Sequence, residues 1–167
     1  PLEDALSIAD YYKRKGPDSL YVESCYYVAG GYIEKGDYPQ ALEWYSKALT
    51  VCEKDSTLQK TVLYTKICLH TGYLYNTIYQ AQKSIATFKK ALKGKENHIT
   101  PYLYDGIGKS FHNLEIDDSA TYYMNKAFDS KCFASEGTRR RLGYSQLATF
   151  YSLKDSSAII KRAKDLE

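Results

Sequence analysis

Three histidines and four cysteines are the side chains of this chain that could hold a metal ion or act as nucleophiles. The histidines are His70, His98 and His112, and no H-E-x-x-H or comparable metal-ligand spacing links them. We expect His70 and His112 to lie in helices, His98 to lie in a connecting loop, and all three to be ordinary surface or groove histidines. The sequence therefore predicts no metal site and no cofactor site.

The cysteines are Cys25, Cys52, Cys68 and Cys132, which show no C-x-x-C spacing and are too sparse for a disulfide scaffold. We predict that they are buried thiols. A nucleophilic thiol needs exposure and a base within reach. Cys25 and Cys68 occupy positions that we expect to face a neighbouring helix, so neither is predicted to be catalytic.

Two short motifs resemble catalytic ones but have simpler structural explanations. The segment DGIGKS, residues 105–110, lacks the G-x4-G-K-[ST] spacing of a phosphate-binding loop and falls inside a predicted helix. The pair Asp117-Asp118 lies where a helix should begin, and carboxylates are favoured there by the helix macrodipole. We therefore predict that this chain is not an enzyme.

Composition limits the remaining classes of protein. The chain has 167 residues, 44% of them hydrophobic and 26% charged, which is typical of a globular domain with its own core. The net charge of +3 is too small to indicate nucleic-acid binding, and the basic runs at 89–95 and 139–141 are expected to be solvated helix ends. No apolar run approaches the ~18 residues of a membrane span, and we expect no signal peptide within these residues. Because the chain begins at Pro1 rather than methionine, we expect it to be a processed or excised piece.

The elements that position these residues are clearest in GYIEKGDYPQALEWYSKAL, residues 31–49. Asp37 is a candidate helix cap with Gln40 three residues later, and Pro39 falls in the first turn, where a missing N–H is harmless. A first helix is expected to end at Gly36. One face of the second helix collects Ala41, Leu42, Tyr45, Ala48 and Leu49 at helical spacing.

This helical hairpin recurs along the chain. Small residues separated by 12 positions mark three copies, namely Ala29 and Ala41, Gly72 and Ser84, and Gly108 and Ala120. A fourth copy begins with Ala148 and Tyr151, and it aligns only if its turn is shortened by about two residues. Each hairpin has an apolar face that only a neighbouring hairpin can cover, which predicts a stacked array.

The segment YVAGGYIEKGDYPQALEWYSKAL resembles the tetratricopeptide repeat (TPR), a helix-turn-helix unit of about 34 residues. The resemblance covers roughly residues 20 to 160. The second and third copies depart from it, because their turns, LYNTIYQA and NLEIDDSA, lack the glycine. The resemblance implies an all-α fold, a right-handed α-solenoid of antiparallel helix pairs with about nine helices.

We expect a single TPR-like domain over residues 1–167. It comprises a helix of a severed repeat at 1–16, repeats at 18–55, 58–97 and 100–132, and a partial or capping repeat at 136–167. The segment KRKGPDS should end the first helix and cap the next one at Asp18 or Ser19.

A narrower resemblance concerns the compartment. The helices of this chain are rich in tyrosine, and the distance from one repeat to the next is nearer 40 than 34 residues. In both respects the chain is similar to the TPR regions of regulators from Gram-negative anaerobes. In that family a membrane helix, a coiled coil and a DNA-binding or kinase-like output domain follow the TPR region, which is thought to be periplasmic. This resemblance implies a periplasmic segment with a role in signal transduction, whereas reduced cysteines would suit the cytoplasm, and both alternatives stay open.

The TPR resemblance also implies a binding surface, because the first helices of such repeats line a concave groove. Tyr26 and Gly30 replace the lysine and asparagine of the family's carboxylate clamp, so a tyrosine-rich groove for an extended peptide or a helix is expected instead. The predicted groove residues are Glu23, Tyr26, Gly30, Glu34, Lys66, Leu69, Tyr73, Asn76, Tyr102, Asp105, Lys109, His112, Asn113, Ser145 and Thr149.

Three functions therefore remain in view. The first is a non-catalytic scaffold that binds a protein or peptide, as the sensory or interaction region of a larger bacterial regulator. The second is an oligomerisation module, through which the chain would form a homodimer. The third, a fragment of a TPR-containing phosphatase, would need an N-terminal catalytic bundle for which this chain has no room. The identity of the ligand stays open.

Overall fold

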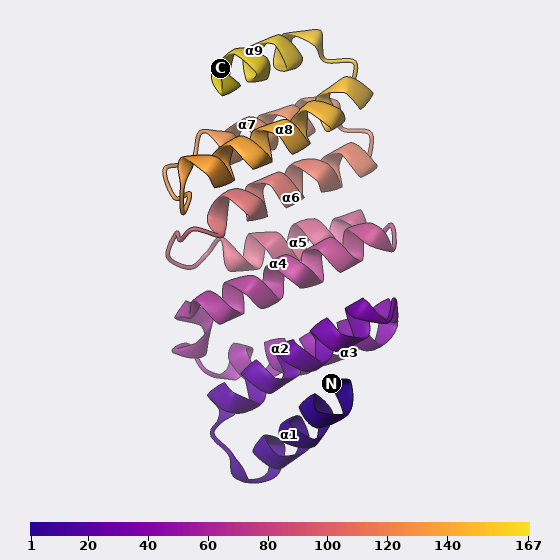
Figure 1. The fold of residues 1–167 in the computed structure, drawn as a ribbon, viewed down its shortest axis with the longest axis vertical. Helices are drawn as coiled ribbons and strands as arrows, with labels where there is room; N and C mark the ends of the chain where they lie inside the picture. Colours follow the sequence, from indigo (N-terminus) through magenta and orange to yellow (C-terminus); the bar gives the residue numbers. More distant parts are fainter. The chain divides into compact units, whose positions relative to one another are not determined.

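The computed structural model describes all residues, 1–167, and it contains nine α-helices and no β-strand, which confirms the predicted all-α class and the number of helices. The helices are α1 Leu2–Lys15, α2 Asp18–Glu34, α3 Tyr38–Lys54, α4 Val62–Thr77, α5 Ala81–Ala91, α6 Thr100–Asn113, α7 Asp117–Phe128, α8 Glu136–Ser152 and α9 Ser156–Leu166 (Figure 1). A short 3-10 helix, η1 Leu58–Lys60, precedes α4. None of the helices combines the length and apolarity that crossing a bilayer requires.

The chain divides into two compact units, residues 1–74 and residues 75–167. In the first unit α1 packs against α2 and α2 against α3. In the second unit α5 packs against α6, α6 against α7, α7 against α8 and α8 against α9 (Figure 1). In both units, helices that follow one another in the sequence pack together.

The start of α3 follows the sequence signal, whereas the start of α2 does not. The side chain of Asp37 accepts a hydrogen bond from the backbone N–H of Gln40 at 3.1 Å, which confirms the predicted cap. The cap expected at Asp18 or Ser19 is wrong. The N-cap of α2 is Pro17, no side chain caps that end, and Asp18 is the first helical residue. Its carboxylate still lies in the first turn, where the helix dipole favours it.

The four turns within helix pairs share one backbone motif. In each, a residue in the left-handed region follows the first helix, and the next residue donates its N–H to a carbonyl five positions earlier. This is the Schellman motif, which satisfies carbonyls that a helix end would otherwise leave without partners. The four N–H to carbonyl pairs are Asp37 to Tyr32, Gln80 to Tyr75, Ile116 to Phe111 and Asp155 to Phe150.

Only one of these turns uses glycine at the left-handed position. Gly36 has φ +74°, whereas Tyr79, Glu115 and Lys154 have φ between 55° and 59°. A side chain with a β-carbon is disfavoured there by roughly 1–2 kcal/mol. The last three turns therefore adopt the left-handed conformation without glycine, the residue that adopts it at no steric cost.

The fourth turn corrects the predicted register of the last helix pair. Because Phe150 accepts the closing hydrogen bond, it is the counterpart of Tyr32, and the turn is not shortened. Phe150 is fully buried, whereas Tyr151, the residue aligned from the sequence, is 78% exposed. The two adjacent aromatic residues look equivalent in sequence, and only the helix phase separates them.

The two cores differ in composition. In the first unit the predicted small and thiol positions are all fully buried, and they include Ala29, Ala41, Ala48, Cys25, Cys52 and Cys68. In the second unit larger side chains fill the core, among them Phe88, Leu103, Ile107, Met124 and Phe128. Cys132 is only partly buried, so the prediction of a buried thiol is wrong at this position. It lies in the loop between α7 and α8.

Gly108 has the packing role expected from its place in the repeat. A β-carbon at this position would lie 2.7 Å from Cγ of Met124 and 3.0 Å from the carbonyl oxygen of Ala120. Both contacts are too close for packed atoms, so α6 and α7 can approach each other only because residue 108 has no side chain. The DGIGKS segment is thus an ordinary part of α6 rather than a phosphate-binding loop.

Candidate functional site

A cavity of about 500 Å³ in the first unit brings together part of the predicted groove. It lies along α1 and α2 and is completed by one residue of α3, Tyr45, and one of α4, His70. We call it the tyrosine cavity. It is lined by Pro1, Leu2, Ala5, Tyr26, Tyr27, Gly30, Gly31, Ile33, Glu34, Tyr45 and His70.

The aromatic wall of the tyrosine cavity is held by contacts between its rings. The hydroxyl of Tyr26 and Nε2 of His70 are 3.2 Å apart and share a hydrogen bond. The Tyr45 and His70 rings are stacked, with centroids 6.2 Å apart and planes 15° from parallel. Tyr27 packs edge-on against Tyr26 at 5.7 Å and is 61% exposed. The wall is thus fixed at its base and exposed at its rim.

Burial disfavours the charged forms of the polar groups of this wall. It raises the pKa of the Tyr26 and Tyr45 hydroxyls above their usual range. It also lowers the pKa of His70, and the nearby Lys66 ammonium lowers it further. Imidazole normally has a pKa near 6.5, so His70 is neutral at pH 7.

Two other lining residues decide how open the cavity is and which charge it carries. A β-carbon at Gly30 would meet no atom within 4 Å, so this part of α2 borders open space. Glu34 is exposed and is the only carboxylate of the lining, and the amino group of Pro1 is the charged group of opposite sign. The cavity is therefore an open aromatic recess with a carboxylate on its border.

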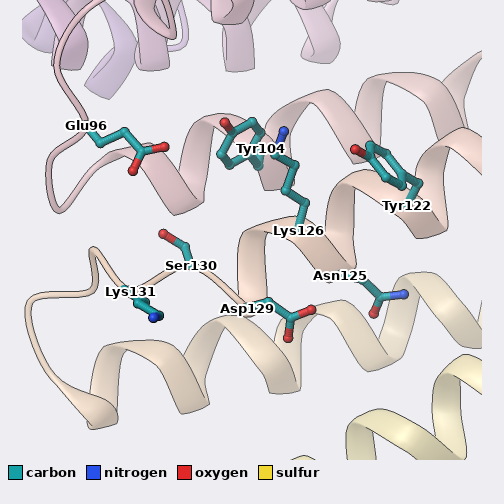
Figure 2. A pocket seen from close by; sticks show the side chains of 8 residues that line it. All are labelled: Glu96, Tyr104, Tyr122, Asn125, Lys126, Asp129, Ser130 and Lys131. Carbon is teal, nitrogen blue, oxygen red and sulfur yellow. The ribbon is translucent and has the colours of Figure 1, made fainter.

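The second unit has a different cavity, of about 600 Å³, shown in Figure 2. It lies between α6, the end of α7 and the loops that precede α6 and follow α7. In Figure 2 the Lys126 side chain reaches over the ring of Tyr104, and its ammonium is 4.6 Å from the ring centroid. The lining residues are Glu96, Tyr104, Tyr122, Asn125, Lys126, Asp129, Ser130 and Lys131.

The charges of the second-unit cavity are balanced. Its lining contains two lysines, Lys126 and Lys131, and two carboxylates, Glu96 and Asp129. Glu96 already accepts a contact from the thiol of Cys132 at 3.6 Å. The lining side chains therefore carry equal numbers of positive and negative charges, and the Lys126 ammonium already lies over the Tyr104 ring.

A buried polar network lies beside the second-unit cavity. Gln146, which is fully buried, donates to Oδ1 of Asp105 at 2.8 Å and to the carbonyl of Met124 at 3.0 Å. Its oxygen accepts a hydrogen bond from the Arg162 guanidinium, which also donates to Asn125 at 2.8 Å. Arg162 is 1% exposed, and burial lowers its pKa to about 10, so it stays charged at neutral pH. Gln146, Asp105 and Arg162 are buried, so this network joins helices in the interior and reaches the cavity only at Asn125.

The structure brings together three of the seven predicted groove residues of the first unit. Tyr26, Gly30 and Glu34 line the tyrosine cavity. The other four lie elsewhere on the unit. Lys66 is exposed, and the remaining three, Glu23, Leu69 and Tyr73, are partly buried.

The predicted groove residues of the second unit do not line its cavity. Asp105 is fully buried, and its carboxylate forms an ion pair with Lys109 at 2.7 Å. The carboxylate is therefore bonded within the protein and is not exposed to a ligand. His112 Nε2 lies 3.0 Å from the Ser152 hydroxyl, and Asn76 donates to the carbonyl of Gly106 at 3.4 Å. Tyr102 and Thr149 are partly buried, and Asn113 and Ser145 are exposed.

Sequence reasoning missed three aromatic members of the tyrosine cavity. Tyr27 and His70 are separated by 43 residues, which is the step between the first two helix pairs, so the repeat itself places them at matching positions. That relation could have identified His70. Tyr45 was assigned to packing alone, and it also borders the cavity although it is 2% exposed.

The remaining cysteines and histidines lie outside the linings of the two cavities. No group of three or more His, Cys, Asp and Glu side chains is arranged to hold a metal ion. Burial raises the pKa of the Cys25 thiol, which makes it a poorer nucleophile. His98 lies in the loop between α5 and α6, as expected.

No family model matches the chain, and no curated protein sequence matches it. Among solved structures it is similar to BtubC (BKLC) from P. vanneervenii, with a TM-score of 0.75 and 14% sequence identity. The similarity covers 92% of this chain and 64% of the BtubC chain, so the chain spans less than two thirds of that protein's length. At this level of identity the likeness shows a common helical fold and nothing about activity.

Proposed function

We propose that this chain is a non-catalytic, TPR-like scaffold that binds an extended peptide or a segment of another protein, as the sensory or interaction region of a larger bacterial regulator. The observation that carries the proposal is the tyrosine cavity. Three residues picked from the sequence as groove positions, Tyr26, Gly30 and Glu34, line one open recess. Exposed tyrosines offer large contact areas at a small cost in side-chain entropy, which suits peptide recognition.

Gly30 provides a direct test because it can be enlarged without a clash. A β-carbon there meets no atom within 4 Å, and leucine is a better helix former than glycine by roughly 1 kcal/mol. Gly30→Leu should therefore leave α2 intact or stabilise it while filling the recess. Peptides selected from a displayed random library against the native chain should lose at least tenfold in affinity for this variant.

Gly137→Leu is the matched control. Gly137 is an exposed glycine in the first turn of α8, and a β-carbon there would have only the Ser135 hydroxyl as a neighbour, at 3.8 Å. This variant should bind the selected peptides as the native chain does. Equal binding by Gly30→Leu and Gly137→Leu, or a library that yields no binder, would refute the proposal.

The oligomerisation module remains the second candidate because α1 presents apolar side chains to solvent. Ile8 is 50% exposed and Tyr11 is 59% exposed. A homodimer that covers them should dissociate in the variant Ile8→Glu. Sedimentation that shows a monomer at high concentration for the native chain would exclude this function for residues 1–167.

A further inference from the structure

We propose that the tyrosine cavity receives a cationic side chain, lysine or arginine, of the bound peptide. This inference rests on the proposed peptide-binding function and specifies the chemistry of its ligand. The cavity combines exposed aromatic faces, an open recess at Gly30 and the carboxylate of Glu34. These features together are complementary to a positive charge at the end of an aliphatic stem.

The aromatic side chains supply the first attraction. The face of a tyrosine ring carries partial negative charge, and it attracts an ammonium or guanidinium group within about 6 Å of its centroid. Tyr27 is exposed at the rim, and Tyr26 is held behind it by the contact with His70. The protein already uses this interaction elsewhere, since Lys47 lies 3.9 Å from the Trp44 ring centroid and Lys126 lies over Tyr104.

The charges around the recess supply the second attraction. Glu34 is the one carboxylate of the lining, and Lys66, which lowers the pKa of His70, is not among the lining residues. A smaller, apolar cavity shares Pro1, Ala5 and Tyr27 with the tyrosine cavity. The only charged side chain in the lining of this smaller cavity is Asp4. Pro1 also lines the tyrosine cavity, but its cationic amino group lies 3.6 Å from the Asp4 carboxylate, which offsets its charge, whereas Glu34 forms no ion pair.

The shape of the recess favours a long side chain over a compact ion. Apolar atoms of Leu2, Ala5 and Ile33 line it together with the rings, and such a surface packs against the methylene groups of lysine or arginine. A glutamate side chain would be repelled by Glu34. An uncharged side chain of the same length would gain the apolar contact without the electrostatic part.

The test uses the whole chain and three blocked tripeptides, Ac-Gly-Lys-Gly-NH2 and its norleucine and glutamate counterparts, followed by NMR of the tyrosine rings. The lysine peptide should shift the Tyr26 and Tyr27 signals and bind about two- to fivefold more tightly than the norleucine peptide. The glutamate peptide should bind most weakly. Norleucine or glutamate binding as tightly as lysine would overturn the inference.

Two variants locate the effect. Tyr27→Leu and Glu34→Gln should each weaken binding of the lysine peptide about two- to fivefold, and both positions are exposed, so the fold should be retained. The matched controls are Tyr144→Leu, a 58% exposed tyrosine of α8, and Glu115→Gln, an exposed carboxylate of the second unit. Loss of lysine preference in a control, or its retention in both test variants, would count against the site.

The library selection separates the two proposals. Peptides that are blocked by Gly30→Leu but carry no basic residue would overturn this inference and leave the proposed function standing. Peptides that are indifferent to Gly30→Leu would overturn both. Basic residues enriched at one position, and lost from the selection when Glu34→Gln is the target, are the expected result.

Discussion

The two units build similar helix pairs around different interiors. The first unit buries small residues and thiols, and it gathers its aromatic polar groups around an open cavity. The second unit buries an arginine, a glutamine and a carboxylate in one hydrogen-bonded network. The repeated backbone motif thus sets where helices end in both units. The side chains of each unit determine whether its polar groups form hydrogen bonds in the interior or line an open cavity.

The largest expected effect tests the role of the buried network. Gln146→Leu removes one hydrogen-bond partner each from the Asp105 carboxylate, the Arg162 guanidinium and the Met124 carbonyl. Asp105 keeps Lys109 and Arg162 keeps Asn125, so the loss of hydrogen bonds to buried charges should reduce the free energy of unfolding of the second unit by about 2 kcal/mol. Hydrogen exchange of amides in α6 to α9 measures this loss. Ser145→Ala, at the exposed neighbouring residue, is the control and should change little.

A loss below about 1 kcal/mol for Gln146→Leu would mean that the network is dispensable, as some buried ion pairs are. The contrast between the two interiors would then concern composition and not energy. A loss that appears equally in α1 to α3 would show instead that the two units unfold together.

The next effect concerns the turn of the first unit. Gly36 adopts φ +74°, where a β-carbon is disfavoured, so Gly36→Ala should lower the free energy of unfolding by about 1 kcal/mol. Trp44 is the only tryptophan of the chain and lies in α3, so its fluorescence in a urea titration reports on the first unit. An unchanged urea midpoint would show that the turn tolerates a side chain as readily as the turns at Tyr79 and Glu115 do.

The second unit offers the reverse experiment, with a smaller effect. Glu115→Gly removes the backbone strain of a non-glycine residue in the left-handed region, but it also adds backbone freedom to the unfolded chain. The two contributions oppose each other, and a net gain of about 0.5 kcal/mol is expected. Differential scanning calorimetry should show a higher midpoint for the second unit. A lower midpoint would indicate that the Glu115 side chain stabilises its turn in a way that glycine cannot.

The sequence predicted the features that depend on neighbours along the chain. The cap at Asp37, the burial of Ala29 and Ala41, and the close contact at Gly108 all follow from spacings within one helix pair. The turn at Gly36 was also predicted, because glycine interrupts the helical pattern there. Tyr79, Glu115 and Lys154 gave no such signal, and the adjacent Phe150 and Tyr151 obscured the register of the fourth turn.

The features that depend on distant residues were not predictable in the same way. Asp105 looked like a groove residue from its helix position, but Gln146, 41 residues later, holds it in the interior. The tyrosine cavity needs α1, α2, α3 and α4 together, and its ring contacts join residues 44 positions apart, as between Tyr26 and His70. A periodic pattern locates a face of a helix, and it does not determine which side chains meet across several helices.

The smallest expected effect is the pH dependence that His70 gives to the first unit. Burial lowers its pKa in the folded chain, so the unfolded chain binds a proton more readily. The stability of the neutral form is therefore fully present above the unfolded pKa of about 6.5 and is lost as the pH falls through that value. The neighbouring Tyr26 and Tyr45 do not titrate in this range, because tyrosine normally has a pKa near 10 and burial raises the pKa of both hydroxyls further. Replacing His70 by phenylalanine keeps a ring to stack on Tyr45 and removes the group that titrates. Urea midpoints from Trp44 fluorescence should fall between pH 7.5 and pH 5.5 more in the native chain than in His70→Phe. Parallel behaviour of the two proteins would mean that the imidazole accepts a proton without disturbing the wall of the cavity, and the aromatic base would then be less rigid than its contacts imply.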